Sequence, residues 1–157
     1  MNLKYLTKEQ QDAITHKIIG CAMEVHSVIG NGFQEVVYQR SLSIEMHLRN
    51  IEHQREFEMP LSYKGYDVGT RRVDFLINEE IAVEIKAVIQ LEDVHLAQAK
   101  NYLEAYNLKT GLLINFGAKS LQFKRLFNKS WKQMDIKTNQ NNYSLNPGNL
   151  FNPKNPG

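Results

Sequence analysis

Hydrophobic positions recur at helical spacing through roughly the first 50 residues of the chain, and after that they alternate with polar ones. Thr7 and Gln10 have the spacing of a helix capping box, and the apolar residues that follow recur every three or four positions as far as Ile29. The sequence Gly30-Asn31-Gly32 predicts the end of this long helix, because glycine and asparagine readily adopt the left-handed cap conformation.

A second helix is predicted over residues 33–50. Glu35 lies in its first turn, where the helix dipole stabilises a carboxylate, and it is expected to lean towards the interior. From the residues alone it is either a capping charge or a ligand that reaches into a site. The predicted buried stripe of this helix consists of Val37, Ile44 and Leu48, flanked by Leu42 and Met46.

From residue 51 onwards the pattern is that of strands separated by turns. Strands are predicted over 52–63 and 66–77, and a third follows a three-residue loop at 78–80. A helix then runs from Asp93 to Asn107, and the apolar run 110–117 predicts a strand buried on both faces. A helix that connects two strands of one sheet makes a right-handed crossover, so the expected class is α/β, with a mixed sheet flanked by helices.

The two strands around the loop 78–80 alternate, with an apolar residue at every second position. A strand with two different faces produces this alternation, and a three-residue loop fixes which residues lie opposite each other. The apolar face is expected to belong to the core. Its predicted pairs are Val73 with Ile85, Phe75 with Val83, and Ile77 with Ile81.

On the polar face the same register puts Asp74 opposite Glu84 and Arg72 opposite Lys86. Directly opposed side chains lie about 5 Å apart, so like charges would repel each other there. A divalent cation between the two carboxylates would relieve the repulsion, and hard oxygen ligands without cysteine favour magnesium or manganese over zinc. The other interpretation is an ordinary charged surface hairpin with its register displaced by one residue, and the hairpin alone leaves both open.

Length and composition indicate one domain with a tail. The chain has 157 residues, and from residue 138 it is dominated by Asn, Pro, Gly and Gln, which predicts a domain over 1–137 and a flexible tail over 138–157. No stretch has the length of a membrane span or the apolar core of a signal peptide. The single cysteine, Cys21, cannot form an internal disulfide, which fits a cytoplasmic location.

Net charge is only +2, so a nucleic-acid partner must be argued from local charge. Basic residues gather between Lys119 and Lys137, against the single acid Asp135. Such a segment can neutralise phosphates, although lysines on a solvated surface are the commoner explanation. From the charge pattern, the candidates for contacts with substrate phosphate are Arg72, Lys124 and Arg125.

Three motifs resemble those of one family. Asp74 followed by Glu84-Ile85-Lys86 and a helix resembles the D…(D/E)xK core of the PD-(D/E)XK nuclease superfamily, with Val73 in place of the usual proline. The run from Gln98 to Tyr102 resembles the QxxxY motif of the RecB-like exonuclease branch, and the run from Gly32 to Tyr38 resembles the signature of the small, mostly bacterial GxxExxY proteins. The resemblance covers about residues 14–127 and implies a restriction-endonuclease-like core.

The resemblance also implies roles for individual residues. Glu35, Asp74 and Glu84 would hold Mg²⁺ or Mn²⁺, and Lys86 would orient or help deprotonate the attacking water and stabilise the phosphate. The residues implied to hold the site or contact the substrate backbone are Gln98 and Tyr102.

The expected function is therefore hydrolysis of phosphodiester bonds in DNA or RNA, with DNA favoured and with low sequence specificity. Two alternatives stay open: a non-catalytic module that binds nucleic acid or protein, and a structural protein in which Asp74 and Glu84 pair with Arg71 and Lys86. Because the chain is too small to wrap a duplex, a homo-oligomer or a larger protein partner is also expected.

Overall fold

The structure is a computed structural model that describes residues 5–133. The predicted tail, 138–157, lies outside the described residues. Within the described part of the chain, no helix is both long enough and apolar enough to span a membrane.

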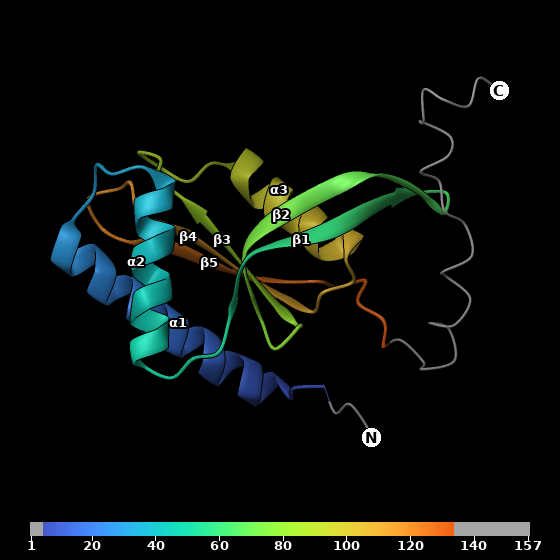
Figure 1. Ribbon diagram of the computed structural model, residues 1–157, viewed down its shortest axis with the longest axis horizontal. Coiled ribbons are helices and arrows are strands. Elements are labelled where there is room, and N and C mark those ends of the chain that lie inside the picture. The colour runs from blue at the N-terminus through green and yellow to red at the C-terminus, as the bar shows by residue number, and fades with distance from the viewer. Residues whose placement is uncertain (1–4, 134–157) are drawn as a thin grey trace, which may run out of the picture.

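Five strands form one mixed sheet, and the order of the elements along the chain follows the prediction as far as β4 (Figure 1). Neighbouring strands are antiparallel except β3 and β4, which are parallel and are joined through α3. The strands lie side by side in the order β1-β2-β3-β4-β5. The elements are α1 (Lys8–Ile29), α2 (Glu35–Leu48), β1 (Gln54–Tyr63), β2 (Tyr66–Ile77), β3 (Ile81–Lys86), α3 (Asp93–Ala105), β4 (Thr110–Asn115) and β5 (Gln122–Phe127).

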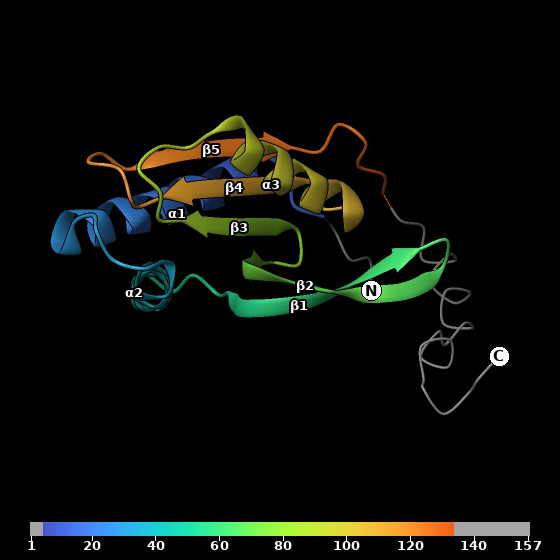
Figure 2. The same cartoon turned by 90° about the horizontal axis from the view of Figure 1, so that it is seen from above.

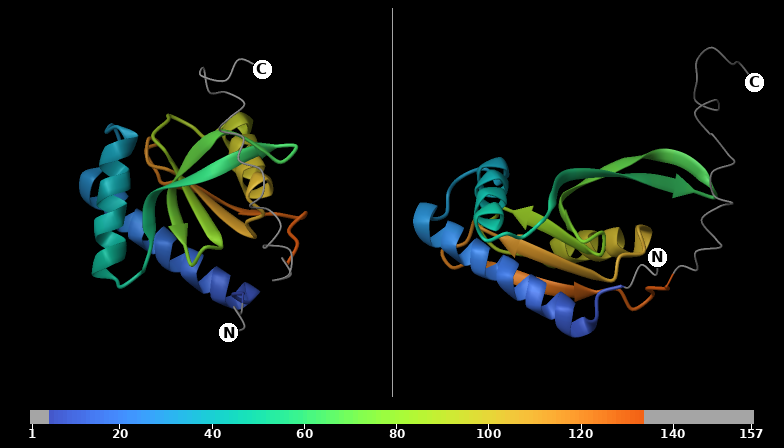
Figure 3. Two further views of the ribbon diagram at one scale, coloured as in Figure 1. Left: turned by 45° about the vertical axis from the view of Figure 1, so that its right-hand side comes forward. Right: turned by 60° about the horizontal axis from the view of Figure 1, so that its bottom comes forward.

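Helices cover both faces of the sheet (Figure 2). Residues of α1 and α2 pack on one face with Phe75, Val83 and Leu112, and residues of α3 pack on the other with Leu76 and Leu113. The predicted α/β class with a restriction-endonuclease-like sheet is thus confirmed. Beyond the sheet, β1 and β2 continue together as a long curved two-stranded arm (Figure 3).

The helix α1 begins and ends where the sequence predicts. Thr7 accepts a hydrogen bond from the backbone N–H of Gln10, and the Gln10 side chain accepts one from the N–H of Thr7. At the other end Gly30 has a φ of 71°, which only glycine adopts without strain. Cys21 is buried on the inner side of this helix.

The predicted buried face of α2 was wrong. Tyr38, Leu42 and Met46 are fully buried, whereas Ile44 is 62% exposed and Leu48 is 68% exposed. Both sets are apolar and both recur at helical spacing, so periodicity alone does not choose between them. The large aromatic ring of Tyr38 stacks on Phe116 in the core, with 4.7 Å between ring centroids, and this packing selects the observed face.

The hairpin of β2 and β3 has the predicted register near its loop. Phe75 lies opposite Val83 and Ile77 opposite Ile81, and the intervening loop of three residues turns through Asn78 and Glu79, whose φ angles are positive.

The prediction was wrong for Val73, which packs on the face of α3 rather than with Phe75. The reason is that β2 pairs with β3 only as far as Phe75 and then continues against β1 alone. The alternation of its side chains therefore changes at Asp74.

The prediction of strands near the end of the domain was incomplete. The run Thr110–Asn115 is buried throughout, as expected, but the neighbouring edge strand β5 was read only as part of a basic segment. Of the residues in β5 only Leu126 is fully buried, so its hydrophobic pattern is too weak to indicate a strand.

Candidate active site

The candidate site lies where β2 separates from β3, and Asp74 stands at the point of separation. Its Oδ2 accepts a hydrogen bond of 2.8 Å from the backbone N–H of Ile85, so the side chain takes the place of a strand partner. Its Oδ1 accepts a second bond of 2.8 Å, donated by Nε2 of Gln39 on α2. These two bonds hold the half-buried carboxylate between the sheet and α2.

Glu84 is the second carboxylate of the site, one residue before Ile85 on β3. Its side chain is 14% exposed, and its Oε1 is buried without any hydrogen-bond partner. Burial, and after it the negative charge of Asp74, raise the pKa of Glu84 from 4.5 to about 8. The pair is therefore an acidic centre whose negative charge favours the binding of a cation or a proton, although Arg71 and Lys86 partly offset it.

Arg71 is the basic side chain closest to this centre. Its Nη2 lies 4.0 Å from Oε1 of Glu84, which is too far for a hydrogen bond, and its guanidinium lies 5.0 Å from the centroid of the Tyr102 ring. Tyr102 is itself fixed, because its ring is buried and its hydroxyl contacts Sδ of Met59 at 2.9 Å. Burial also raises the pKa of Tyr102. Tyr102 thus holds the guanidinium of Arg71 beside the acidic centre.

Lys86 ends β3, two residues after Glu84, and is half-buried. The chain that follows it is anchored by Asn115, whose Oδ1 accepts hydrogen bonds of 3.0 Å from the N–H groups of Val88 and Gly117. The Nδ2 group of Asn115 donates to the carbonyl of Val88 and to Gln122, so this fully buried amide has no free polar atom. The loop that leaves Lys86 is therefore held firmly against β4.

Glu35 lies in the first turn of α2, as predicted, but it is exposed as a residue. Burial of its carboxyl group raises the pKa of Glu35, nearby Lys86 opposes this change, and Asp74 adds to it. Within residues 5–133 no three acidic, histidine or cysteine side chains lie close enough together to hold a metal ion. The expected cluster of Glu35, Asp74 and Glu84 is thus not assembled as a three-acid site, and the close pair is Asp74 with Glu84.

The sequence profile described as the PD-(D/E)XK nuclease superfamily matches residues 12–126, from α1 to β5. The chain belongs to the PD-(D/E)XK nuclease superfamily. No match was found among curated proteins. Among solved structures, the crystal structure of SSO0001 is similar with a TM-score of 0.42 and 17% identity, over 80% of this chain and 81% of that one.

Nucleases are the usual members of this superfamily, and they generally use Mg²⁺ or Mn²⁺. In this PD-(D/E)XK protein, Tyr38 is the tyrosine of the run that resembles GxxExxY, and its role in the structure is to hold the loop before α2. The hydroxyl of Tyr38 donates a hydrogen bond of 2.6 Å to the carbonyl of Gly30 and accepts one of 3.2 Å from the N–H of Phe33. It thereby fixes the loop between α1 and α2 and the first turn of α2 that carries Glu35.

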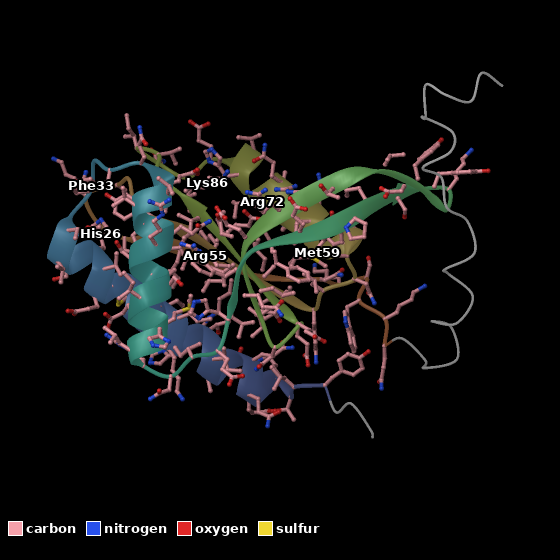
Figure 4. All side chains as sticks on the ribbon, in the orientation of Figure 1. His26, Phe33, Arg55, Met59, Arg72 and Lys86 are labelled. Carbon is pink, nitrogen blue, oxygen red and sulfur yellow. The ribbon has the colours of Figure 1, made fainter. Side chains whose placement is uncertain are left out.

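The predicted phosphate-binding residues are dispersed. Arg72 lies on the arm and pairs with acids of β1, at 3.0 Å from Glu58, so the predicted opposition of Arg72 and Lys86 was wrong (Figure 4). The physical reason is that β2 has already left β3 at this point. Lys124 and Arg125 are exposed on the edge strand β5.

Of these two, only Lys124 shares a face of the sheet with Glu84. Leu113 of β4 lies opposite both Glu84 and Lys124, whereas Arg125 lies opposite Leu112, which packs towards α1. Two strand spacings separate Lys124 from Glu84, or about 10 Å along that face. Gln98, also predicted to belong to the site, is exposed on α3.

Sequence reasoning missed Gln39, which bonds Asp74 directly. A signal was present, because Gln39 lies one helical turn after Glu35 and next to Tyr38. Arg71 entered only as a partner in the structural alternative, and the strand register did not indicate its place beside Tyr102.

Proposed function

We propose that this protein is a metal-dependent nuclease that hydrolyses phosphodiester bonds of nucleic acid, with DNA as the favoured substrate. The observation that supports this most is the buried, unpartnered Oε1 of Glu84 beside the carboxylate of Asp74. A protein selected only for folding gains nothing from such a pair, because a buried acceptor without a partner lowers stability. The motif resemblance supports a place among the GxxExxY proteins and the RecB-like branch.

The residues present fit a divalent cation with oxygen ligands. Mg²⁺ is commonly held by one or two carboxylates together with water and substrate phosphate, so Asp74 and Glu84 suffice as protein ligands. A cation would give Oε1 of Glu84 the partner that it lacks. Glu35, one turn before Gln39 on α2, is proposed as an outer acid of the same site.

When bound, the ion would polarise the phosphate and make a water molecule more acidic. The chain supplies the orientation and the remaining charge. Lys86, held at the end of β3, would stabilise the negative charge that develops on the phosphate. Arg71, rather than Arg72, would contact the substrate phosphate, because Tyr102 directs it towards Glu84 while Arg72 is engaged by Glu58.

Further residues are proposed to contact the substrate outside the acidic centre. Lys124 on the shared face and Gln98 on α3 are proposed contacts with the nucleic-acid backbone, and Arg125 is the weaker candidate because it faces the other side. Contacts of this kind read no bases, so we expect low sequence specificity. We also propose a cytoplasmic location and association with a second copy or a larger protein. The proposed nuclease domain is a single one over residues 1–137.

The test is degradation of end-labelled single- and double-stranded DNA and RNA with Mg²⁺, Mn²⁺ or EDTA. Wild type is compared with Asp74→Asn and Lys86→Ala, and Lys17→Ala on the exposed side of α1 is the matched control. Metal-dependent cleavage that is lost in both site variants and kept in the control is the expected result. Binding without cleavage, unchanged by Lys86→Ala, would instead favour the non-catalytic module.

A further inference from the structure

Two buried side-chain atoms within residues 5–133 lack a hydrogen-bond partner, and both lie next to Asp74. One is Oε1 of Glu84, and the other is Oε1 of Gln39. A buried acceptor in a native protein is normally satisfied by protein or by ordered solvent. Two unsatisfied acceptors next to one carboxylate therefore make this place suited to a ligand that donates hydrogen bonds.

The orientation of the Gln39 amide follows from its chemistry. An amide has a donor end and an acceptor end, and a carboxylate only accepts. Nε2 must therefore face Asp74, with which it makes its bond of 2.8 Å, and Oε1 must point elsewhere. The side chain cannot turn out to solvent without leaving that bond, and Gln39 is only 7% exposed.

The place of Gln39 is fixed by the core of α2. Tyr38 and Leu42, on either side of it along the helix, are fully buried, and Tyr38 is also tied to the loop before α2. The amide is consequently held against the acidic centre by the same packing that orients the helix. A side chain held in this way, with one end engaged and one end free, is arranged to bind something.

We propose that Gln39 is a positioning residue of the metal site, which rests on the proposed function. Its N–H holds the carboxylate of Asp74, and its Oε1 accepts a hydrogen bond from a water ligand of the divalent cation. Water on a divalent cation is a strong hydrogen-bond donor, since the charge of the ion makes its protons more acidic. Groups that orient metal ligands in this way are commonly worth 10–100-fold in metal affinity.

The experiment measures Mn²⁺ affinity of the full chain by calorimetry, with no nucleic acid present. Gln39→Leu removes both ends of the amide at similar volume, and it should weaken Mn²⁺ binding by about 10–100-fold. Gln39→Glu removes the donor but keeps an acceptor, and it should bind Mn²⁺ at least as tightly as wild type. Gln34→Leu is the matched control, because Gln34 begins the same helix, is exposed and makes no capping bond with its side chain.

Each outcome has a distinct meaning. Wild-type affinity in Gln39→Leu would overturn the inference, while nuclease activity of the wild type would keep the proposed function intact. Weak binding in both Gln39 variants would assign the effect to the bond with Asp74 alone and overturn the acceptor role of Oε1. Absence of Mn²⁺ binding and of cleavage in the wild type would refute the proposed function itself. Melting temperatures without metal show that each variant is folded.

Discussion

Replacing Glu84 by glutamine should make the metal-free protein more stable at high pH. Burial and the charge of Asp74 raise the pKa of Glu84 from 4.5 to about 8. The folded protein therefore holds this proton more tightly than the unfolded chain does. The free energy of unfolding is highest below pH 4.5 as far as this group is concerned, and it falls as the pH rises through about 8.

The magnitude follows from the difference between the two pKa values. At about 1.4 kcal/mol for each tenfold change in proton affinity, the stability lost between pH 4.5 and 8 is roughly 5 kcal/mol. Screening by solvent reduces this little, because the side chain is only 14% exposed. Glutamine has the shape of protonated glutamate and no charge, so Glu84→Gln should match wild type at pH 5 and exceed it by several kcal/mol at pH 9.

The assay is urea unfolding in EDTA at pH 5, 7 and 9. Glu104→Gln, an exposed acid on α3, is the control and should follow wild type throughout. If the free energy of unfolding changed with pH in the same way for wild type and Glu84→Gln, the reasoning would be refuted, since Glu84 would then titrate as it does in water. Mg²⁺ bound by the ionised carboxylate should restore the wild type at pH 9 and leave Glu84→Gln unaffected.

Three other substitutions should have measurable effects. Gly117→Ala would place a Cβ 2.4 Å from the carbonyl oxygen of Val88, so the free energy of unfolding measured with urea should fall by about 2–3 kcal/mol. An unchanged urea midpoint would mean that the loop moves to make room for the methyl group. Tyr38→Phe leaves the carbonyl of Gly30 and the N–H of Phe33 without their partner and should cost about 1–3 kcal/mol, again by urea unfolding, with no loss expected if solvent replaces the hydroxyl. Arg71→Ala should raise the KM for nucleic acid about tenfold while Arg72→Ala leaves it nearly unchanged, and equal effects would contradict the assignment of Arg71 to the phosphate.

Apolar residues at every second position on both sides of a short loop made the hairpin of β2 and β3 predictable. The three-residue loop sets the register that places Phe75 opposite Val83. A slip by one residue is disfavoured, because it would move the apolar face from the core to solvent. The predicted register put Asp74 opposite the side chain of Glu84, whereas the Asp74 carboxylate accepts a hydrogen bond from the backbone N–H of Ile85 and replaces a backbone partner.

Elements with two apolar faces, or with none, were not predictable in the same way. On α2 the stripe of Ile44 and Leu48 is as regular as that of Leu42 and Met46, and only the surrounding sheet decides which one is buried. On β5 nearly every side chain is exposed at least in part, so its sequence has no strong period.

The place of a side chain relative to distant residues was likewise out of reach. Gln39 meets Asp74 across 35 positions of the chain, and Arg71 reaches Tyr102 through the twist of β2. Single-sequence patterns describe neighbours within an element, whereas these contacts depend on how the elements pack.

The bond between Asp74 and the N–H of Ile85 makes one residue both the branch point of the sheet and a member of the acidic centre. A related protein without catalytic activity would still need an acceptor there, because the N–H of Ile85 would otherwise have no hydrogen-bond partner where the strands separate. Asn or Ser could serve as that acceptor. Glu84 makes no comparable structural bond, and its buried, unpartnered Oε1 lowers the stability of the fold. In related proteins without activity, the glutamate should therefore be replaced before the aspartate. An aspartate at position 74 without the glutamate would be weak evidence of activity.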